Sequence, residues 1–198
     1  MVIGIAGKTA AGKNMAANTL EKQGYLIIDA DKLGIEALTA NKNAIVAAFG
    51  TAILDSSGEV SRPKLGQLVF SGKEQLVKLN AISHPYIVEQ IKKIIEQNKE
   101  REIAINAALL PYWPLKGYVN VVIWLTAPLP VRVIRALKRD KRGLLFTLKR
   151  IYSQRSLSLK YLSYKVDIYR VRNYCGQRYL NKQMVKILSK IKQGGYAK

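Results

Sequence analysis

Cysteine and histidine each occur once in this chain of 198 residues, as Cys175 and His84. A lone cysteine excludes a disulfide within the chain, and one cysteine with one histidine argues against a structural zinc site. No apolar run reaches the roughly 18 residues that a membrane-spanning helix needs. The apolar stretch at residues 2–6 is also too short for the core of a secretory signal. We therefore expect a soluble protein of the reducing cytoplasm with no membrane partner.

Acidic residues are scarce in the second half of the chain. Residues 101–198 hold 21 lysines and arginines but only three acids, whereas residues 1–100 hold 12 basic and 10 acidic residues. The net charge of +20 is thus concentrated in one half, which predicts a polyanionic partner: a small ligand with several phosphates, nucleic acid or an acidic surface. The alternative is that the basic residues only form a solvated face.

A glycine loop lies close to the start of the chain. Residues 7–14 read GKTAAGKN, one position away from the phosphate-binding pattern G-x-x-x-x-G-K-[ST]. Gly7 and Gly12 permit a tight turn that presents backbone N–H groups to phosphate oxygens, and Lys13 supplies a charge for the outer phosphates. Asn14 stands in place of the hydroxyl residue that normally ligates magnesium, although an amide oxygen also ligates hard cations. The loop predicts a nucleoside triphosphate site.

The surroundings of the loop favour the same interpretation. Residues 2–6 have the composition of a buried strand, and residues 13–23 show the apolar spacing of a helix that ends at Gly24. The motif requires this order of strand, loop and helix, because the positive end of the helix dipole then meets the phosphates. The alternative is a Gly/Ala-rich turn that contains a lysine by chance.

Strands and helices alternate along the rest of the chain. Strands are expected at 25–28, 102–107, 118–125 and 166–171, and helices at 31–50 in two pieces, 64–71, 73–82, 86–98, 128–140, 144–164 and 177–192. His84 and Pro85 are expected to interrupt the helices on either side of them. This order predicts one α/β domain in which helices flank a mostly parallel sheet, and ligands bind beyond the carboxyl ends of such strands.

Asp31 is the candidate general base. It follows the second expected strand, where a carboxylate beside the glycine loop can take the proton of an attacking hydroxyl group in phosphoryl transfer. Asp29 is expected to orient the backbone or to pack behind it. The alternative role for Asp31 is the N-cap of the helix that follows, and one residue can serve both purposes.

A basic face is expected on the helix at 128–140. Arg132, Arg135 and Arg139 share this face because they are spaced three and four residues apart. In a phosphoryl-transfer enzyme a mobile basic helix can close over the nucleotide and neutralise developing charge, which we favour for Arg139 and Arg135. The alternative is a solvated helix end stabilised by the helix dipole. A lone histidine such as His84 is more typical of packing or capping than of catalysis.

With these features the chain resembles the dephospho-CoA kinase family over most of its length. The matching pieces occur in the family's order: the glycine loop, IDAD at 28–31, FG at 49–50, ILD at 53–55, Gly58, VF at 69–70, ISHP at 82–85, LL at 109–110, RALKRD at 135–140, Gln154, Asn173 and Gly176. The aspartate pair and the His-Pro pair at these distances are the more specific pieces, since the glycine loop occurs in many families.

The resemblance implies a P-loop kinase that uses ATP and magnesium to phosphorylate the 3′-hydroxyl of dephospho-CoA, giving CoA and ADP in the last step of coenzyme A biosynthesis. It implies one domain, residues 1–198, with a core at about 1–31, 101–134 and 166–198, a helical acceptor-binding region at about 32–100 and a basic helical lid at about 135–165. The implied catalytic residues are Asp31, Lys13 and Arg139; Asp31 and His84 bind the acceptor, and Asn14 faces the metal. The implied nucleotide contacts are Gly7, Lys8, Thr9, Ala10, Ala11, Gly12, Lys13, Asn14, Met15, Arg135, Arg139, Asn173 and Gly176.

The chain departs from the family's pattern at four positions. Asn14 replaces the serine or threonine of the loop, and Asn106 stands where an acidic residue is common. Ala108 replaces the proline of a Pro-Leu-Leu piece, and Tyr112 stands where a glutamate often follows. These differences concern magnesium affinity and turnover more than the fold. Two rival functions stay open: a nucleoside or nucleotide kinase of the same fold, and a nucleotide-binding protein with weakened catalysis whose basic half binds nucleic acid.

Overall fold

The computed structural model describes residues 1–70, 72–139, 143–162, 166–174 and 176–196, so that Asp140 and Cys175 lie outside the described residues. The chain forms two compact units, one made of residues 1–29 and 92–198 and the other of residues 30–91. Within the described ranges, no helix combines the length and the apolar character that would let it cross a membrane.

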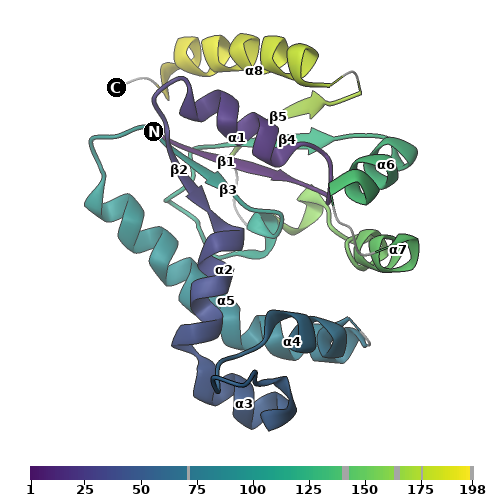
Figure 1. The fold of residues 1–198 in the computed structure, drawn as a ribbon. Helices are drawn as coiled ribbons and strands as arrows, with labels where there is room; N and C mark the ends of the chain where they lie inside the picture. The colour runs from purple at the N-terminus through teal and green to yellow at the C-terminus, as the bar shows by residue number, and fades with distance from the viewer. Residues whose placement is uncertain (71, 140–142, 163–165, 175, 197–198) are drawn as a thin grey trace. The chain divides into compact units, whose positions relative to one another are not determined.

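A parallel sheet forms the centre of the first unit (Figure 1). The described strands are β1 (Val2–Gly7), β2 (Leu26–Asp29), β3 (Ile103–Asn106), β4 (Val121–Thr126) and β5 (Asp167–Arg172), arranged in the order β2-β3-β1-β4-β5. Every neighbouring pair is parallel, which confirms the predicted α/β class. Strands β1 and β3 are buried along their whole length, as expected for a sheet covered on both faces.

The register of the sheet decides which polar residues meet at its carboxyl edge. Asn106, the last residue of β3, pairs with Ile5 of β1 on one side and with Asp29 of β2 on the other. Gly7 at the end of β1 pairs with Leu125 of β4. The glycine loop, Asn106 and Asp29 therefore leave the sheet at the same edge, where ligands of parallel sheets bind.

Two helices pack side by side on one face of this sheet (Figure 1). They are α1 (Lys13–Glu21) and α8 (Gln177–Ile191), and the residues between them and the strands form the main core of the unit. Ile3, Ile5 and Leu125 from the strands meet Leu20 of α1 and Leu180 of α8 in this core. Each such side chain contributes about 1.5–3 kcal/mol when it is fully buried. This packing fixes the direction of α1 and hence the aim of its first turn.

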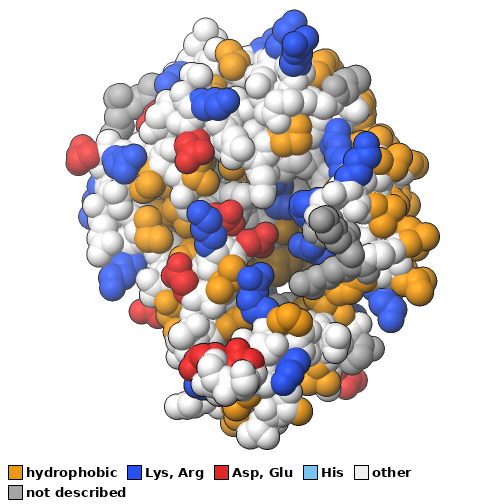
Figure 2. Space-filling model, viewed as in Figure 1, with side chains coloured by type: hydrophobic (Ala, Val, Ile, Leu, Met, Phe, Trp, Pro, Cys, Tyr) orange, Lys and Arg blue, Asp and Glu red, His pale blue; other side chains and the backbone are white. Residues whose placement is uncertain are grey.

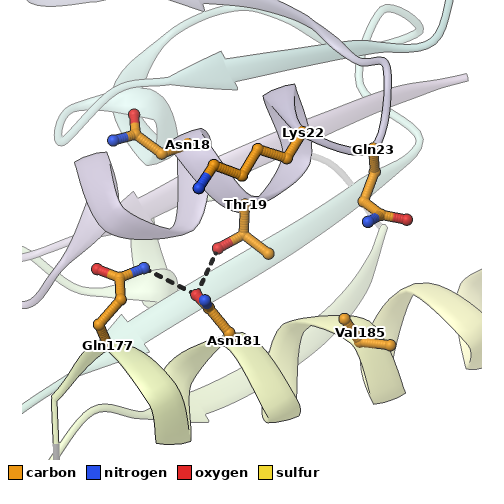
Figure 3. Close-up of a pocket in the computed structure, with 7 residues that line it drawn as sticks. All are labelled: Asn18, Thr19, Lys22, Gln23, Gln177, Asn181 and Val185. Atoms are coloured by element: carbon orange, nitrogen blue, oxygen red, sulfur yellow. Dashed lines mark hydrogen bonds between the residues drawn. The ribbon is translucent and has the colours of Figure 1, made fainter.

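A small pocket of about 170 Å³ lies between α1 and α8 (Figure 3). Asn181 is at its centre, where its Oδ1 accepts hydrogen bonds from Oγ1 of Thr19 at 2.8 Å and from Nε2 of Gln177 at 2.7 Å. The bond from Thr19 ties α8 to α1, whereas the bond from Gln177 lies within α8. Thr19 and Asn181 thus contribute to the packing of the two helices.

The basic segment after β4 contains less helix than expected. Helix α6 (Leu129–Arg139) matches the prediction, but α7 (Leu144–Ser153) ends well before residue 164, and a 3₁₀ turn (Leu159–Tyr161) follows it. The expected helix at 144–164 is therefore wrong from Gln154 to Leu162, and residues 163–164 lie outside the described residues. Gln154 leaves the helical conformation because its side chain bonds to the glycine loop, a contact with a residue 145 positions away.

The second unit, residues 30–91, consists of helices. They are α2 (Ala30–Ala40), α3 (Lys42–Phe49), α4 (Arg62–Val69) and the start of α5 (Lys73–Gln97). Ile45, Ile53, Leu65 and Val69 form their shared core. The break near residue 41 and the turn at residues 55–58 occur as predicted, with Oδ1 of Asp55 accepting from the backbone N–H of Ser57 and of Glu59.

Helix α5 contradicts the expected interruption at His84 and Pro85. It runs without a break from Lys73 to Gln97, with Pro85 inside it. Proline in a helix interior removes one hydrogen bond, which here leaves the carbonyl of Ala81 without its usual donor, at a cost of about 3 kcal/mol. Ala81 is exposed, so water reaches that carbonyl, and the buried Ile87 and Val88 hold the turn after the proline in helical conformation.

Candidate nucleotide-binding site

Residues 7–14 form a tight loop between β1 and α1. Gly7 and Gly12 have φ angles of 152° and 108°, which residues other than glycine rarely adopt. A Cβ atom on Gly7 would collide with the carbonyl oxygen of Leu125, and one on Gly12 would collide with Nδ2 of Asn173. Ala10 also has a positive φ, 60°, the only such non-glycine value among the described residues. Both glycines of the motif are therefore required by space as well as by backbone conformation.

The first turn of α1 is built to receive an anion. Its N-cap is Gly12, which has no side chain to accept from the first N–H groups, and the turn contains no acidic residue. Nζ of Lys13 donates to the carbonyl of Gly7 at 3.2 Å, which holds the lysine across the loop. The N–H groups of the first helical turn, the positive end of the dipole and an ammonium group thus meet at one place.

Arg132 of α6 supports the loop from a buried position. The side chain is 7% exposed, and its Nε donates to the carbonyl of Thr9 at 2.8 Å. Burial lowers the pKa of this guanidinium group. Its Nη2 atom has no hydrogen-bond partner among the described residues. Sequence reasoning placed Arg132 on the basic face but gave it no role, and only its shared face with Arg135 and Arg139 could have pointed to it.

Gln154 holds the other side of Thr9. Its Oε1 accepts from the backbone N–H of Thr9 at 2.6 Å and from Oγ1 of Thr9 at 2.8 Å. Next to it, Nζ of Lys8 donates to the carbonyl of Arg155 at 3.0 Å. The segment after α7 therefore fixes the start of the loop. In the sequence Gln154 was only a matching piece of the family pattern, without an assigned contact.

Replacing Gln154 tests this support directly. Gln154→Leu leaves the N–H and hydroxyl donors of Thr9 unpaired, and Thr9 is only 4% exposed. We expect the free energy of unfolding to fall by about 1–3 kcal/mol in urea titrations. Gln154→Glu keeps an acceptor for both donors and should stay close to the wild type. Equal stability of the two variants would show that the contact does not hold the loop.

Asn173 and Arg135, two of the predicted nucleotide contacts, lie behind the loop. Asn173 is fully buried, and its Nδ2 donates to the carbonyl of Ala11 at 3.0 Å. Its Oδ1 accepts from Nη2 of Arg135 at 3.2 Å, and Nη1 of Arg135 has no partner among the described residues. Gly176 forms the N-cap of α8 with a φ of 86°.

The two asparagines that depart from the family pattern contact each other. Asn14, in the first turn of α1, is exposed, whereas Asn106, at the end of β3, is 6% exposed. Nδ2 of Asn106 donates to Oδ1 of Asn14 at 3.1 Å. The Oδ1 atom of Asn106 is buried and has no partner among the described residues. The structure thus pairs two residues that are 92 positions apart in the chain.

A cavity of about 500 Å³ borders the loop on the side of Lys8 and Arg132. The carboxyl end of β4 and the residues after α7 line it, Lys160 and Arg170 add two more cations, and the lining holds no acid among the described residues. This size is typical of ligand pockets. The charges favour an anionic group as its occupant.

The remaining predicted residues occupy different places. Arg139 is exposed at the end of α6, and Met15 is half-buried and packs against the main core. Asp31 and His84 belong to the second unit. Asp31 is exposed in the first turn of α2, which begins at Ala30, so the N-cap alternative for it is wrong. His84 is half-buried in α5, and burial lowers its pKa.

Apolar and basic side chains gather over α6 and α7 on the right of the face shown in Figure 2, where acidic ones are few. The exposed large apolar residues of these two helices are Leu129, Ile134, Leu144, Leu145, Leu148 and Tyr152. Such a surface is more apolar than a merely solvated helix end requires.

The chain matches a known protein family over most of its length. The family model of dephospho-CoA kinase matches residues 1–166. This chain belongs to the dephospho-CoA kinase family. The dephospho-CoA kinase of Moorella thermoacetica is 37% identical over 160 residues, which cover 77% of this chain and 76% of that protein. The dephospho-CoA kinase of Bacillus licheniformis is 32% identical over 169 residues, which cover 81% and 83%.

Solved structures share the fold of this member of the dephospho-CoA kinase family. A protein from Thermus thermophilus superimposes with a TM-score of 0.74 at 23% identity, covering 96% of this chain and 97% of that one. The dephospho-CoA kinase from Campylobacter jejuni superimposes with a TM-score of 0.59 at 22% identity, covering 96% of each chain. These likenesses confirm the P-loop kinase fold, and the family assignment favours neither of the two rival functions.

Proposed function

We propose that this chain is an ATP-dependent kinase that phosphorylates the 3′-hydroxyl of dephospho-CoA, giving CoA and ADP. The observation that carries the proposal is the glycine loop of residues 7–14, whose Gly12-capped helix and Lys13 face one point. A family of dephospho-CoA kinases that matches residues 1–166 supplies the acceptor. Together they favour dephospho-CoA over the nucleosides and nucleotides that other kinases of this fold accept.

The loop binds the nucleotide in this proposal. Its backbone N–H groups and the Lys13 ammonium take the outer phosphates of ATP, and Arg132, Gln154 and Asn173 keep the loop in shape before the ligand arrives. Arg135 and Arg139 offset the charge that develops during transfer. We assign the basic cavity beside Lys8 to an anionic group of a substrate. The apolar and basic surface of α6 and α7 is assigned to closing over the nucleotide.

Asp31 acts as the general base. It accepts the proton of the 3′-hydroxyl as the hydroxyl oxygen bonds to the γ-phosphorus and the bond from that phosphorus to the β–γ bridging oxygen breaks, releasing ADP. Its exposure in the first turn of α2 leaves the carboxylate accessible to an acceptor. His84, whose lowered pKa keeps it neutral near pH 7, is assigned to positioning dephospho-CoA.

The side-chain ligands that this site offers to magnesium are amide oxygens. Asn14 presents an exposed side chain, and Oδ1 of Asn106 is a buried acceptor without a partner among the described residues, so both fit a hard cation as neutral ligands. The described residues contain no group of three or more His, Cys, Asp or Glu side chains that could hold a metal ion. Magnesium, when bound, would offset the negative charge of the phosphates.

The proposal is tested by assaying the purified chain with ATP, magnesium and dephospho-CoA. We expect CoA and ADP in equal amounts, separated and quantified by liquid chromatography. Adenosine, deoxyadenosine and AMP serve as rival acceptors in parallel reactions. Failure to form CoA, in a buffer where another dephospho-CoA kinase succeeds, would contradict the proposal. Faster transfer to a rival acceptor would move the chain to the nucleoside or nucleotide kinases.

A further inference from the structure

We propose that Asn14 and Asn106 form a charge-neutral cation site, so that this chain binds nucleotide with little dependence on magnesium. The inference rests on the proposed nucleotide site and goes beyond it, because it concerns how the cation is held. Neither asparagine alone suggests it. The hydrogen bond of 3.1 Å between them joins both departures from the family pattern in one place.

The position and the burial of the two asparagines support a cation site. Asn14 directly follows Lys13 in the first turn of α1, and its side chain is exposed to solvent. Asn106, to which it is bonded, is the last residue of β3. Asn106 is more than nine-tenths buried, yet its Oδ1 has no hydrogen-bond partner among the described residues. A buried amide oxygen without a donor is costly, so its persistence indicates that a ligand uses it.

The chemistry of the pair differs from that of a hydroxyl and a carboxylate. Amide oxygens ligate hard cations through their dipoles but bring no negative charge. A carboxylate at position 106 would attract the divalent cation and repel phosphate oxygens, which makes nucleotide binding depend on the metal. With two amides both effects are absent. The cation then arrives and leaves as part of the metal–nucleotide complex, held chiefly by the phosphates.

The pairing also explains why the two changes occur together. Serine at position 14 would be too short to reach Nδ2 of Asn106, which would leave both polar atoms of a buried amide unpaired. With aspartate at position 106, the Asn14 amide can turn to donate its own N–H to the carboxylate. We therefore expect Asn106→Asp, which keeps a partner at position 14, to fold well, and Asn14→Ser to lower stability.

Asp29 is the neighbouring carboxylate that could supply the missing charge. It pairs with Asn106 in the sheet register and ends β2 at the same edge. If Asp29 held the cation, the wild type would depend strongly on magnesium, and Asp29→Asn would remove that dependence. This makes Asp29→Asn the variant that separates the two explanations.

The experiment measures the dissociation constant of ADP by calorimetry, once with EDTA and once with magnesium in excess. The ratio of the two constants is the coupling between metal and nucleotide. For the wild type we expect a ratio within about threefold of one, and for Asn106→Asp and Asn14→Ser/Asn106→Asp a ratio of about tenfold or more. Asn43→Asp makes the same change at an exposed position in α3 and should leave the ratio unchanged.

The outcomes distinguish this inference from the proposed function. A wild-type chain that binds ADP under neither condition contradicts the nucleotide site itself. Binding with a wild-type ratio of about tenfold or more overturns the neutral cation site, and loss of that ratio in Asp29→Asn transfers the role to Asp29. A ratio near one in the wild type that Asn106→Asp does not raise also overturns it. A low wild-type ratio that rises with the carboxylate supports it.

Discussion

Replacing Asp31 with asparagine is expected to lower the turnover number for CoA formation by about 10²- to 10⁴-fold, the range typical of a lost general base. The amide has the same shape but cannot take the proton of the acceptor hydroxyl. Because Asp31 is exposed in the first turn of α2, the change should leave the fold intact. The dissociation constant of ADP should also stay within about threefold, since the nucleotide contacts lie in the loop. Steady-state assays and calorimetry measure the two quantities.

The control for this prediction lies on the same helix. Glu36 is exposed in α2, so Glu36→Gln removes a carboxylate of the same helix without touching the proposed base. It should retain the turnover number of the wild type. Unchanged turnover in Asp31→Asn would remove Asp31 from the role of base. Equal losses in both variants would show that the charge of the helix matters instead of a particular proton acceptor.

Gly12→Ala is expected to lower the free energy of unfolding by about 2–5 kcal/mol and to abolish measurable ADP binding. Two effects add. Alanine is strained at the φ of 108°, and its Cβ would collide with Nδ2 of Asn173, which is buried and bonded to Ala11 and Arg135. Relief of the collision must displace Asn173 and with it the back of the loop. Urea unfolding and calorimetry with ADP measure the two results.

Gly24→Ala separates the two effects. Gly24 has a φ of 91° but no atom within 4 Å of the place a Cβ would take. Its replacement should therefore cost only the backbone strain, about 1–2 kcal/mol, and should leave ADP binding unchanged. If Gly12→Ala is no more destabilising than Gly24→Ala, the close approach of Asn173 does not matter. If Gly12→Ala still binds ADP normally, the loop tolerates the displacement.

The parts of the fold that the sequence predicted well depend on short stretches of chain. The strand, glycine loop and helix within residues 2–23 follow from apolar spacing and two glycines, and the strands ending at Asn106 and Thr126 follow from runs of apolar residues. Alternation of strands and helices then implied the parallel sheet, because parallel neighbours need crossover connections. The family pattern carried the same information over residues 1–166.

Element ends were harder to predict where distant contacts decide them. Pro85 indicated an interruption, but buried residues after it keep α5 helical and an exposed carbonyl before it is reached by water. Residues past Ser153 indicated more helix, but Gln154 bonds to Thr9 instead. In both cases packing outweighed a local preference worth only a few kcal/mol.

The glycine loop and the class of fold could be predicted from the sequence, because glycine conformation and apolar periodicity act between near neighbours, and the family followed from the resemblance of its motifs. Only the tertiary structure decided that Arg132 and Gln154 hold Thr9, that Asn173 requires the space left by Gly12, and that Asn14 meets Asn106. These pairs are 92 or more positions apart, and strand order and register bring them together. Neither strand order nor register can be read from the spacing of residues along a single segment.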